Sequence, residues 1–506
     1  MNSSDSCELA TPSDRSMRLS ETSRCAILGK EFFQIAPQPI CSPGLVMYGF
    51  WRTSRLPALL IAAMVALGCQ PSVETPEPNA AKEAAPLRIL LVDETSLDEV
   101  LQREWSARFD TPLSIEHVTA ADLSQAKRLG TDVVIFPTMM LGSLAEADLI
   151  APLPTDEVES QARDVREQFA NVRAETRWEG QTFGVSLGSP RWLLAYRSDL
   201  LAQAGIEPPQ TWAQLSEACQ RLADRSQFAD LPIAKEKWYS LLQPTAPQNG
   251  GNWMLARAAS KLAAGSQISP LLNYDTLEPR LTSPAIVDAL SALVSDATSA
   301  GQTDELSPSL CWQKIVAGEC AMAIAFPERL DEAALDATPK TIRESIRFVP
   351  LPSSEEGSTI AFGGFSGRIV SVASASDQPQ LAATFLWWLT SSEIASRIAP
   401  ACADTCPTSP QQLEQLSSWT GELAGAPLES AKEALKQTLE ASEQLIPLRV
   451  PGYQLYAEAL DKAVRDTLSK KSDAQKALEA ASAEWKGTTV AKGSDGQRQA
   501  YHRSLK

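Results

Sequence analysis

Residues 87–136 decide the fold, and they read LRILLVDETSLDEVLQREWSARFDTPLSIEHVTAADLSQAKRLGTDVVIF. Three short apolar segments alternate here with two helical patterns. The apolar segments span residues 87–92, 113–118 and 133–136. Ser96 and Glu99 have the spacing of a capping box at the start of the first helix, and residues 472–475 predict another box near the C-terminus. Between them, Gly205 is expected to end one helix and Thr211 to cap the next. A strand–helix–strand–helix–strand order predicts an α/β fold, with a largely parallel sheet that carries helices on both faces.

Candidate ligand-binding residues follow from the direction of these strands. Ligands on open α/β sheets bind beyond the carboxyl ends of parallel strands. This rule selects Asp93, Glu94 and Thr95 after the first strand, and Pro137, Thr138 and Met139 after the third. The carboxylates of Asp93 and Glu94 suit the hydroxyl or ammonium groups of a ligand, but at the start of a helix they also suit its dipole. The sequence leaves both roles open.

A short apolar run near the N-terminus has the layout of a secretory signal. Residues 56–67 are apolar, Arg52 and Arg55 precede them, and Gly68 and Cys69 follow. About 12 apolar residues are too few for a membrane-spanning helix, which needs roughly 20. The sequence VALGC, which ends at Cys69, resembles a bacterial lipobox, in which the cysteine carries the lipid. We expect Cys69 to be the lipidation site, with an ordinary signal cleaved nearby as the alternative.

The composition changes on both sides of this signal. Residues 1–46 are polar and Ser-rich, and we expect translation to start at Met47, with 47–68 as the signal peptide. Residues 69–86 are rich in Pro, Ala and Glu, which suits a flexible tether. About 420 residues follow, which is enough for two or three domains. The formal net charge of -17 disfavours nucleic acid as a partner, because the chain would repel phosphates.

Nine cysteines and two histidines bound the metal and redox chemistry. Three cysteines precede the expected start and Cys69 is assigned to lipid, which leaves five. Candidate disulfides in an oxidising compartment are Cys311 with Cys320 and Cys402 with Cys406. Cys219 would remain a buried thiol. Neither His117 nor His502 lies at metal-ligand spacing from a cysteine, so we expect no metal site and no cofactor.

Three consecutive segments resemble a known family. They read GQTFGV at 180–185, LAYRSDL at 194–200 and AGIEPPQTW at 204–212. Their order and spacing are similar to the signature of family 1 extracellular solute-binding proteins, the maltose-binding class of ABC transporters. Further similar segments lie at 315–323, 348–352, 382–393 and 451–485. The resemblance therefore covers roughly residues 87–485.

This resemblance implies a type II periplasmic-binding-protein fold, in which a hinge joins two α/β lobes with mostly parallel sheets. The chain would cross between the lobes near residues 189–193 and again near Pro327. The implied parts are residues 87–191 with 328–385 for the first lobe, 192–327 with 386–490 for the second, and 491–506 for a polar C-terminal tail.

The implied function is capture of a small polar solute, a carbohydrate or polyol, and its delivery to the permease subunits of an ABC importer. The protein would be a monomer without catalytic residues, held outside the cytoplasm, at the periplasmic face or the cell surface of a bacterial membrane, through the lipid on Cys69. Two alternatives stay open: a stand-alone sensory or binding lipoprotein for an anionic solute, and a lipoprotein hydrolase. The hydrolase is the weaker one, because His117 and His502 form no catalytic set with a serine or cysteine.

The resemblance also adds cleft residues, since a closing cleft needs polar groups and aromatic faces around the solute. They are Ser189 and Arg191 at the first hinge, Arg329, Phe365 and Ser366 of the glycine-rich loop FGGFSG, and Tyr453. Trp253 joins them because it follows the polar loop QNGGN at the entry to a helix, where an aromatic ring can face the cleft. Each has a structural alternative. Trp253 suits core packing, as does either Tyr453 or Tyr456, the loop suits a strand turn, and the arginines suit a salt bridge between lobes. Trp387 and Trp388 are expected in the core.

Two departures from the family bear on the solute. Sugar-binding members place a Pro-Trp pair where residues 327–329 read Pro-Glu-Arg, and maltose-binding members have a carboxylate where this chain has Pro190. An anionic or amphoteric solute, held by charge-assisted bonds to Arg191 or Arg329, is therefore the competing hypothesis.

Overall fold

The computed structural model describes residues 85–123, 126–154, 163–234, 237–264 and 269–506. These residues belong to one compact unit, which spans Asn79–Lys506. The expected start at Met47, the signal peptide, the lipidation site Cys69 and the tether up to residue 84 lie outside the described residues. Among those described, no helix is both long and apolar enough to cross a membrane.

The first sheet has five strands in the order β2-β1-β3-β12-β6. They are β1 (Leu87–Val92), β2 (Leu113–Val118), β3 (Val133–Pro137), β6 (Val185–Ser186) and β12 (Arg368–Val372). β1 pairs in parallel with β2 and β3, whereas β12 is antiparallel to β3 and β6. Four of these strands therefore run in one direction and β12 runs against them. The strand–helix alternation predicted over residues 87–136 is confirmed.

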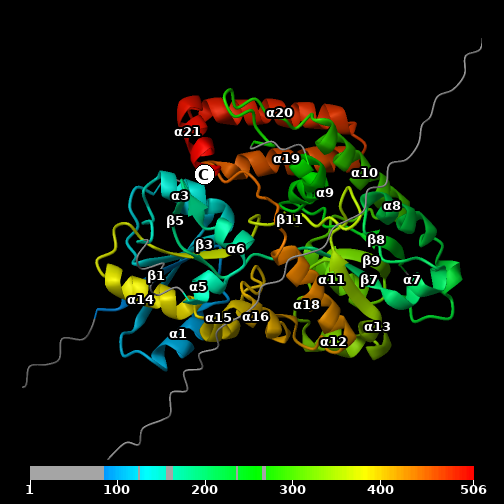
Figure 1. The fold of residues 1–506 in the computed structure, drawn as a ribbon, viewed down its shortest axis with the longest axis horizontal. Helices are drawn as coiled ribbons and strands as arrows, with labels where there is room; N and C mark the ends of the chain where they lie inside the picture. The colour runs from blue at the N-terminus through cyan, green and yellow to red at the C-terminus, as the bar shows by residue number, and fades with distance from the viewer. Residues whose placement is uncertain (1–84, 124–125, 155–162, 235–236, 265–268) are drawn as a thin grey trace, which may run out of the picture. The chain divides into compact units, whose positions relative to one another are not determined.

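Helices α1 (Asp98–Ser106), α14 (Pro379–Thr390) and α15 (Ser392–Ile398) pack against this sheet (Figure 1). Aromatic rings make the contact: the ring centroid of Trp105 lies 5.2 Å from that of Phe385 and 5.0 Å from that of Trp388. Trp388 is buried, and the half-buried Trp387 packs against the same cluster. Both tryptophans therefore serve the core, as predicted.

The start of α1 differs from the prediction. Its N-cap is Leu97, which makes no side-chain cap, so the expected capping box of Ser96 and Glu99 is wrong. The carboxylate of Glu94 instead accepts the backbone N–H groups of Thr95 and Ser96, at 2.9 and 2.6 Å. The cap lies further upstream because the backbone turns at Asp93, which has a positive φ of 49°.

The second sheet has the order β10-β7-β9-β8. Its strands are β7 (Leu193–Arg197), β8 (Tyr239–Leu242), β9 (Cys320–Ala325) and β10 (Ile346–Pro350). β7 is antiparallel to β9 and β10, and β8 is parallel to β9. Each large sheet thus has one reversed strand among parallel ones. Two small pairs complete the strands: β4 (Arg177–Trp178) with β5 (Gln181–Thr182), and β11 (Ala361–Phe362) with β13 (Gln444–Leu445).

The helices around the second sheet form layers on both sides of it (Figure 1). α18 packs on β10, α8 and α10 on β8, and α11 on β9, while α19 packs on α9 and α20. These helices are α8 (Trp212–Arg221), α9 (Gly250–Ala264), α10 (Pro284–Ala300), α11 (Pro308–Val316), α18 (Ala426–Leu439), α19 (Tyr453–Leu468) and α20 (Ala474–Ala491).

The remaining helices are short, apart from the C-terminal one. They are α2 (Ala120–Leu123), α3 (Leu141–Glu146), α5 (Arg163–Glu167), α6 (Ala170–Ala174), α7 (Ser198–Ala204), α12 (Glu332–Ala337), α13 (Lys340–Ser345), α16 (Pro410–Glu414), α17 (Ser417–Thr420) and α21 (Ser494–Ser504). Three 3-10 helices are η1 (Thr138–Met140), η2 (Arg225–Phe228) and η3 (Ala399–Ala401).

Local sequence signals set several helix ends. Thr211 caps α8 and forms a capping box with Gln214, which confirms the predicted N-cap. α7 ends at Gly205 in the left-handed conformation, as its pattern predicted. α20 is capped by Asp473, whose side chain accepts the N–H of Lys476 at 2.9 Å, rather than by the box expected over residues 472–475.

The chain crosses three times between the two large sheets. Residues 187–192 lead from β6 to β7, residues 351–367 lead from β10 to β12, and residues 402–409 lead from η3 to α16. The second crossing therefore lies later than the one expected near Pro327. The reason is β10, which pairs with β7 and keeps residues 346–350 in the second lobe.

The lobes consequently have bounds different from those implied by the resemblance. α14 and α15 bury their apolar faces with β1, β3 and β12, so the first lobe extends beyond residue 385 to about residue 398. The C-terminal residues expected as a polar tail instead form α21, in which Ala500 and Tyr501 are buried. An alanine and a tyrosine on one face give this polar helix enough apolar surface to pack.

The five described cysteines are free thiols. The disulfides expected between Cys311 and Cys320 and between Cys402 and Cys406 are therefore not formed in this structure. Cys402 Sγ instead donates to Glu94 Oε2 at 2.8 Å, and Cys406 Sγ to the carbonyl of Ser189 at 2.8 Å. Cys219 is a buried thiol, as predicted.

Candidate functional site

The carboxyl ends of both large sheets meet at the first crossing. In the first sheet, β1, β3 and β6 end at the edge where β12 begins, because Arg368 is in register with Pro137. In the second sheet, β9 and β10 end at the edge where β7 begins, because Leu193 is in register with Ala325 and Pro350. Only residues 187–192 separate β6 from β7. The two strand-end edges therefore lie on either side of this crossing.

Asp93 and Glu94 lie at the strand-end edge of the first sheet. The sequence left two roles open for them, ligand binding and stabilisation of the helix start, and the structure gives them different surroundings. Glu94 has a side chain only 7% exposed and holds the turn before α1, since it accepts from Thr95, Ser96 and Cys402. Asp93 is exposed, and its Oδ1 accepts the N–H of Ala120 at 3.1 Å. Asp93 is thus the carboxylate of the two that a solute can reach.

The ionisation of Glu94 reflects these partners. Burial alone would favour the neutral acid, but hydrogen bonds from Cys402 and Ser96 and the charge of Arg368 favour the carboxylate more strongly. The pKa of Glu94 is therefore lowered from its ordinary value. Glu94 stays negative at neutral pH and can hold Arg368.

Arg368 joins the residues at this edge into one group. Its Nη2 lies 3.3 Å from Glu94 Oε2 and donates to the carbonyl of Asp93 at 3.1 Å, while its Nη1 lies 3.1 Å from Asp404 Oδ2. Tyr453, at the start of α19, completes the group. Burial and the negative charge of Asp93 raise the pKa of Tyr453 to about 12, so its phenol keeps its proton. We call Asp93, Glu94, Arg368, Asp404 and Tyr453 the strand-end cluster.

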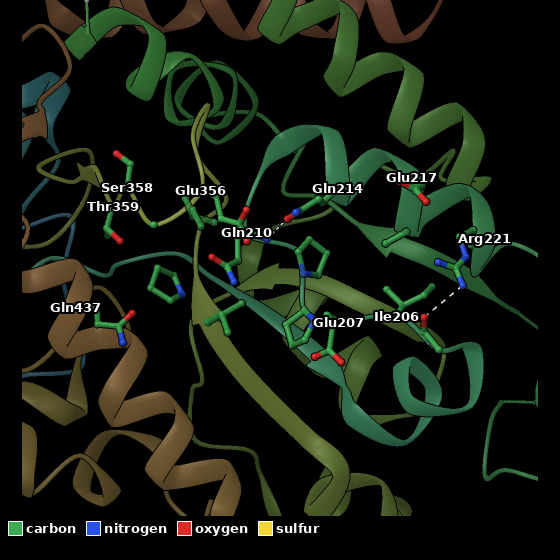
Figure 2. A pocket seen from close by; sticks show the side chains of 18 residues that line it. Ile206, Glu207, Gln210, Gln214, Glu217, Arg221, Glu356, Ser358, Thr359 and Gln437 are labelled. Carbon is green, nitrogen blue, oxygen red and sulfur yellow. Dashed lines mark hydrogen bonds between the residues drawn. The ribbon is translucent and has the colours of Figure 1, made fainter. Parts of the chain in front are cut away.

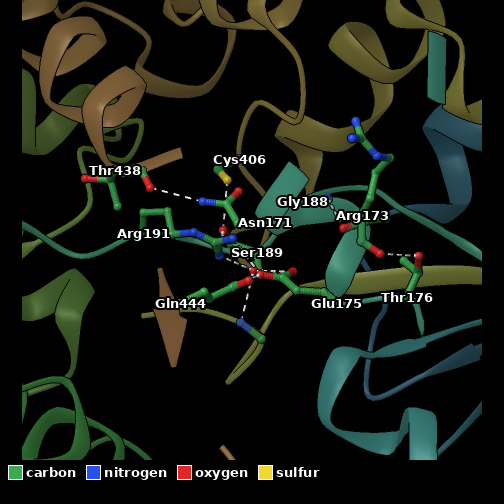
Figure 3. Close-up of polar contacts among 12 residues, drawn as sticks. Asn171, Arg173, Glu175, Thr176, Gly188, Ser189, Arg191, Cys406, Thr438 and Gln444 are labelled. Atoms are coloured by element: carbon green, nitrogen blue, oxygen red, sulfur yellow. Dashed lines mark hydrogen bonds and ion pairs between the residues drawn. The ribbon is translucent and has the colours of Figure 1, made fainter. Parts of the chain in front are cut away.

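Ser189 and Arg191 belong to a second group, which is buried inside the crossing (Figure 3). Arg191 Nη2 lies 2.5 Å from Glu175 Oε1, and both side chains are 0% exposed. Ser189 Oγ donates to Glu175 Oε2 at 2.8 Å, and Gln444 Nε2 donates to Glu175 Oε1 at 3.2 Å. We call Glu175, Ser189, Arg191 and Gln444 the crossing cluster. It realises the salt bridge that was the structural alternative for Arg191.

The glycine-rich loop packs against the crossing cluster rather than against an open site. A Cβ added at Gly363 would collide with the guanidinium of Arg191 and the carboxylate of Glu175, and one added at Gly367 would collide with Ser189. The close backbone approach expected of this loop is present, but its partner is the buried ion pair. The ring centroid of Phe365 lies 4.3 Å from that of Trp192, with the two planes tilted by 44°, and Ser366 is half-buried.

Trp253 lies in the core and not in a cleft. Its side chain is 0% exposed, and Nε1 donates to Gln243 Oε1 at 2.9 Å. Its ring centroid is 6.0 Å from that of Trp192 and 5.8 Å from that of Trp212. The ligand-binding role predicted for Trp253 is therefore corrected to packing, because its ring lies among those of Trp192 and Trp212 in the core.

The other predicted residues do not join either cluster. Thr138 is fully buried, and its Oγ1 has no hydrogen-bond partner within the described part of the chain. Arg329 is exposed and donates to the carbonyl of Ser418 at 3.0 Å. Tyr456 is buried against Trp485, with its hydroxyl near Thr489, so Tyr453 is the tyrosine at the strand ends.

Sequence reasoning missed Arg368 and Asp404. Arg368 follows the glycine loop directly, but its place opposite Pro137 depends on β12 running antiparallel to β3, which no local signal reveals. Asp404 lies between the two cysteines of the third crossing, which had been expected to bridge a loop. The bond from Cys402 to Glu94 shows that this segment faces the first lobe instead.

A cavity of about 730 Å³ lies elsewhere, beside the loop between α7 and α8 (Figure 2). It is lined by Glu207, Gln210, Gln214, Glu217, Arg221 and residues 356–359, among others, and by none of the predicted site residues. Some of its polar groups are already engaged: Gln214 belongs to the capping box of α8, and Arg221 donates to the carbonyl of Ala204 at 2.7 Å. Size alone therefore does not make this cavity the site. Within the described residues, no group of three or more potential metal ligands comes together.

Residues 116–404 match the family described as bacterial extracellular solute-binding protein. The chain belongs to this family. Its members bind solutes and are not enzymes, so the hydrolase alternative falls away. No curated protein matches the sequence.

Solved structures of solute-binding proteins share the fold. A ribitol complex of an ABC transporter solute-binding protein from Agrobacterium radiobacter K84 superposes with a TM-score of 0.61 at 18% identity, covering 80% of this chain and 99% of that one. Maltose-bound MalE3 of T. maritima gives 0.61 at 18%, covering 80% and 100%. The sugar-binding protein MalE of Xanthomonas citri gives 0.61 at 16%, covering 81% and 98%. The type II fold with two α/β lobes, which the resemblance implied, is thereby confirmed.

In this solute-binding protein the crossing cluster should carry a large share of stability. Arg191→Met would leave the Glu175 carboxylate buried without its counter-charge, and we expect a loss of about 3–5 kcal/mol in the free energy of unfolding. Urea denaturation measures this loss. The exposed Arg329→Met serves as the matched control and should change little. Replacing both Arg191 and Glu175 by Met should recover much of the loss. If Arg191→Met were as stable as the control Arg329→Met, the stabilising role of the crossing cluster would be contradicted.

His117, in β2 of the solute-binding protein, makes pH-dependent hydrogen bonds to the residues that follow β1. Its Nε2 lies 2.8 Å from Asp98 Oδ2 and its Nδ1 2.8 Å from the carbonyl of Glu94. The bond to Asp98 is the main reason that the pKa of His117 is raised. A raised pKa means that the protonated ring stabilises the fold below about pH 6.5, and that this contribution is lost as the pH rises through the higher folded pKa.

We therefore predict that His117→Gln is less stable than the parent protein at acidic pH and that the gap narrows as the pH increases. Urea denaturation across about pH 5.5 to 8.5 spans the unfolded pKa and measures the gap. Asp98→Asn should reduce the same pH dependence, because it removes the partner that raises the pKa. A gap between parent and His117→Gln that stays constant over the whole range would count against these pH-dependent hydrogen bonds.

Proposed function

We propose that this protein is the extracytoplasmic, lipid-anchored binding component of an ABC importer. It would hold a small polar solute, a carbohydrate or polyol, between its two lobes and present it to the permease. The observation that carries the proposal is the meeting of both strand-end edges at the first crossing, with the exposed carboxylate of Asp93 and the protonated phenol of Tyr453 at that place.

The charges of the strand-end cluster favour a neutral polyhydroxyl solute over an anion. Arg368 is the single cation of the strand-end cluster, and it already pairs with two carboxylates, those of Glu94 at 3.3 Å and Asp404 at 3.1 Å. The cluster contains a third carboxylate, that of Asp93, so its net charge is negative. Arg191, which an anionic solute was expected to use, is buried and paired with Glu175. Hydroxyl groups can donate to Asp93 and both donate to and accept from Tyr453. The solved relatives with ribitol, maltose and D-mannitol bind ligands of this class.

A second candidate, an anion-binding lipoprotein without a permease, retains one observation in its favour. Arg329 is exposed, and its guanidinium donates to the carbonyl of Ser418 at 3.0 Å. One exposed guanidinium offers a weak site by itself, since solvent screens it. The solute panel described next separates the two candidates.

The proposal predicts a thermal shift with one class of solute. A compound at 100 times its dissociation constant should stabilise the protein by about 2.7 kcal/mol, so a panel of sugars, polyols and organic acids is screened by differential scanning fluorimetry. We expect a sugar or polyol to raise the melting temperature. A shift with organic acids alone would favour the anion-binding candidate, and a melting temperature unmoved by the whole panel would remove the support for solute capture.

Asp93→Asn then tests the site itself. Asparagine tolerates the positive φ at this position and keeps an acceptor for the N–H of Ala120, but it loses the charge that strengthens bonds from hydroxyls. We expect affinity about ten-fold weaker by calorimetry, since a charge-assisted bond contributes about 1.5–3 kcal/mol and the neutral bond that asparagine can still accept contributes about 0.5–1.5 kcal/mol. Asp148→Asn is the matched control, because Asp148 is also exposed and has a φ of 54°.

The lipid anchor is a separate part of the proposal and rests on the sequence. Cys69 follows an apolar run of signal-peptide length, in a segment that resembles a lipobox. We predict that protein expressed from Met47 in a bacterial host fractionates with membranes and that Cys69→Ser releases it. Mass spectrometry should detect the acyl chains on Cys69 in the parent protein. Cys219→Ser, at a buried thiol, should leave fractionation unchanged. Membrane attachment that survives Cys69→Ser would rule out this anchor.

A further inference from the structure

The C-terminal helix α21 is held by the second lobe on one of its sides. Tyr501 is 2% exposed, and its hydroxyl lies 2.7 Å from Ser269 Oγ. The ring of His502 stacks on that of Tyr274, with centroids 3.9 Å apart and planes 8° from parallel. Ser269 and Tyr274 lie between α9 and α10, and α21 itself follows α20. The helix is therefore part of the second lobe by chain path and by packing.

The last residues of the same helix bind the first lobe. Arg503 Nε donates to Glu146 Oε1 at 2.6 Å, and Arg503 Nη2 pairs with Glu146 Oε2. The backbone N–H of Glu179 donates to the carbonyl of Arg503 at 3.0 Å, and Lys506 Nζ lies 3.6 Å from Glu179 Oε1. Glu146 ends α3, and Glu179 lies in the turn between β4 and β5. α21 thus ties the lobes together in addition to the three crossings.

The carboxylate of Glu146 is held in place by a residue of its own lobe as well as by Arg503. Trp178 Nε1 donates to Glu146 Oε1 at 2.7 Å, and Trp178 is 2% exposed in the same apolar cluster as Tyr501. A carboxylate that is already held loses little freedom when a two-pronged guanidinium binds it. This geometry makes the pair stronger than an ordinary surface salt bridge, although both side chains keep some exposure, 28% for Arg503 and 16% for Glu146.

The tie coexists with other contacts that hold the two lobes close together. Arg449, just before α19 of the second lobe, donates through Nη2 to the carbonyl of Arg177 of the first lobe at 3.4 Å, and a Cβ added at Gly142 in α3 would collide with the carbonyl of Arg449. Any motion that separates the lobes must break the bonds of Arg503 or move α21 off Tyr274. Bonds made only in one arrangement shift the population toward it.

We propose that Arg503 and Glu146 form a clasp that favours the arrangement with the lobes close together, and that the clasp strengthens solute binding without touching the solute. The inference rests on the proposed function for its affinity effect, but its conformational effect can be measured without any solute. Arg503 and Glu146 are positioning residues in this scheme.

The conformational test uses single-molecule fluorescence energy transfer between the lobes. The native described cysteines are buried, so dyes can be placed on Thr384→Cys in α14 and Glu332→Cys in α12, two exposed positions. Arg503→Gln and Glu146→Gln should increase the population with the longer distance in the absence of solute. Glu146→Gln keeps an acceptor for Trp178, so it removes the charge and leaves the local packing. Arg498→Gln is the matched control, because it breaks an ion pair with Asp495 inside α21 that does not reach the first lobe.

The affinity test uses the solute that the panel identifies. Arg503→Gln should bind it about five-fold more weakly by calorimetry, the change expected from losing one partly exposed ion pair, and Arg503→Lys should recover part of the affinity. Urea denaturation of Arg503→Gln and Arg498→Gln shows whether a stability loss alone accounts for the change. An unchanged distance distribution overturns the clasp, and a changed distribution with unchanged affinity overturns its effect on binding. If no solute binds even the parent protein, the proposed function fails while the distance measurement still decides the clasp.

Discussion

The buried ion pair between Arg191 and Glu175 is the interaction on which the two-lobed arrangement depends. Removing two charges from water costs several kcal/mol for each ion, and only good geometry with further hydrogen bonds offsets that cost. Here the remaining lone pairs of Glu175 are used by Ser189 and Gln444. All three crossings reach this point. Ser189 and Arg191 belong to the first, Gly363 and Gly364 of the second pack on them, and Cys406 of the third donates to Ser189. A pair that fits only when all three segments are in place specifies how they come together.

The reversed strand in each sheet explains why the functional residues gather beside this pair. β7 is the first strand after the chain crosses into the second lobe, and β12 is the first strand of the large sheet after the chain returns to the first lobe. Both begin at the edge where their neighbours end. Consequently the residue that opens β12, Arg368, stands among the residues that follow β1 and donates to the carbonyl of Asp93. The same arrangement places carboxylates on both sides of Arg368. The strand ends are therefore left with an acidic excess that disfavours anions and suits hydroxyl donors.

Local patterns predicted the parts of this architecture that depend on local physics. The bounds of β1 and β2, the N-cap at Thr211 and the end of α7 at Gly205 follow from apolar periodicity and capping chemistry, and the importance of Asp93 and Glu94 follows from strand direction. The failures required long-range information. Trp253 was placed in a cleft because a polar loop precedes it, but its ring is buried beside Trp192 and Trp212, which lie 61 and 41 positions earlier in the sequence. Residues 346–350 were assigned to the wrong lobe because only their pairing with β7 shows where they belong.

The charge pair at the crossing and the charge pair of the clasp differ in burial, and this difference separates their roles. Arg191 and Glu175 are 0% exposed, so neither can part from the other without leaving an uncompensated charge in the interior. Arg503 and Glu146 are 28% and 16% exposed, so water can take over their hydrogen bonds when they part. The first pair is thus suited to a pivot that persists in every arrangement of the lobes, and the second to a contact that forms and breaks. A binding protein that must hold a solute and then release it needs both: a fixed axis for the motion and a bond between the lobes that can part at low cost.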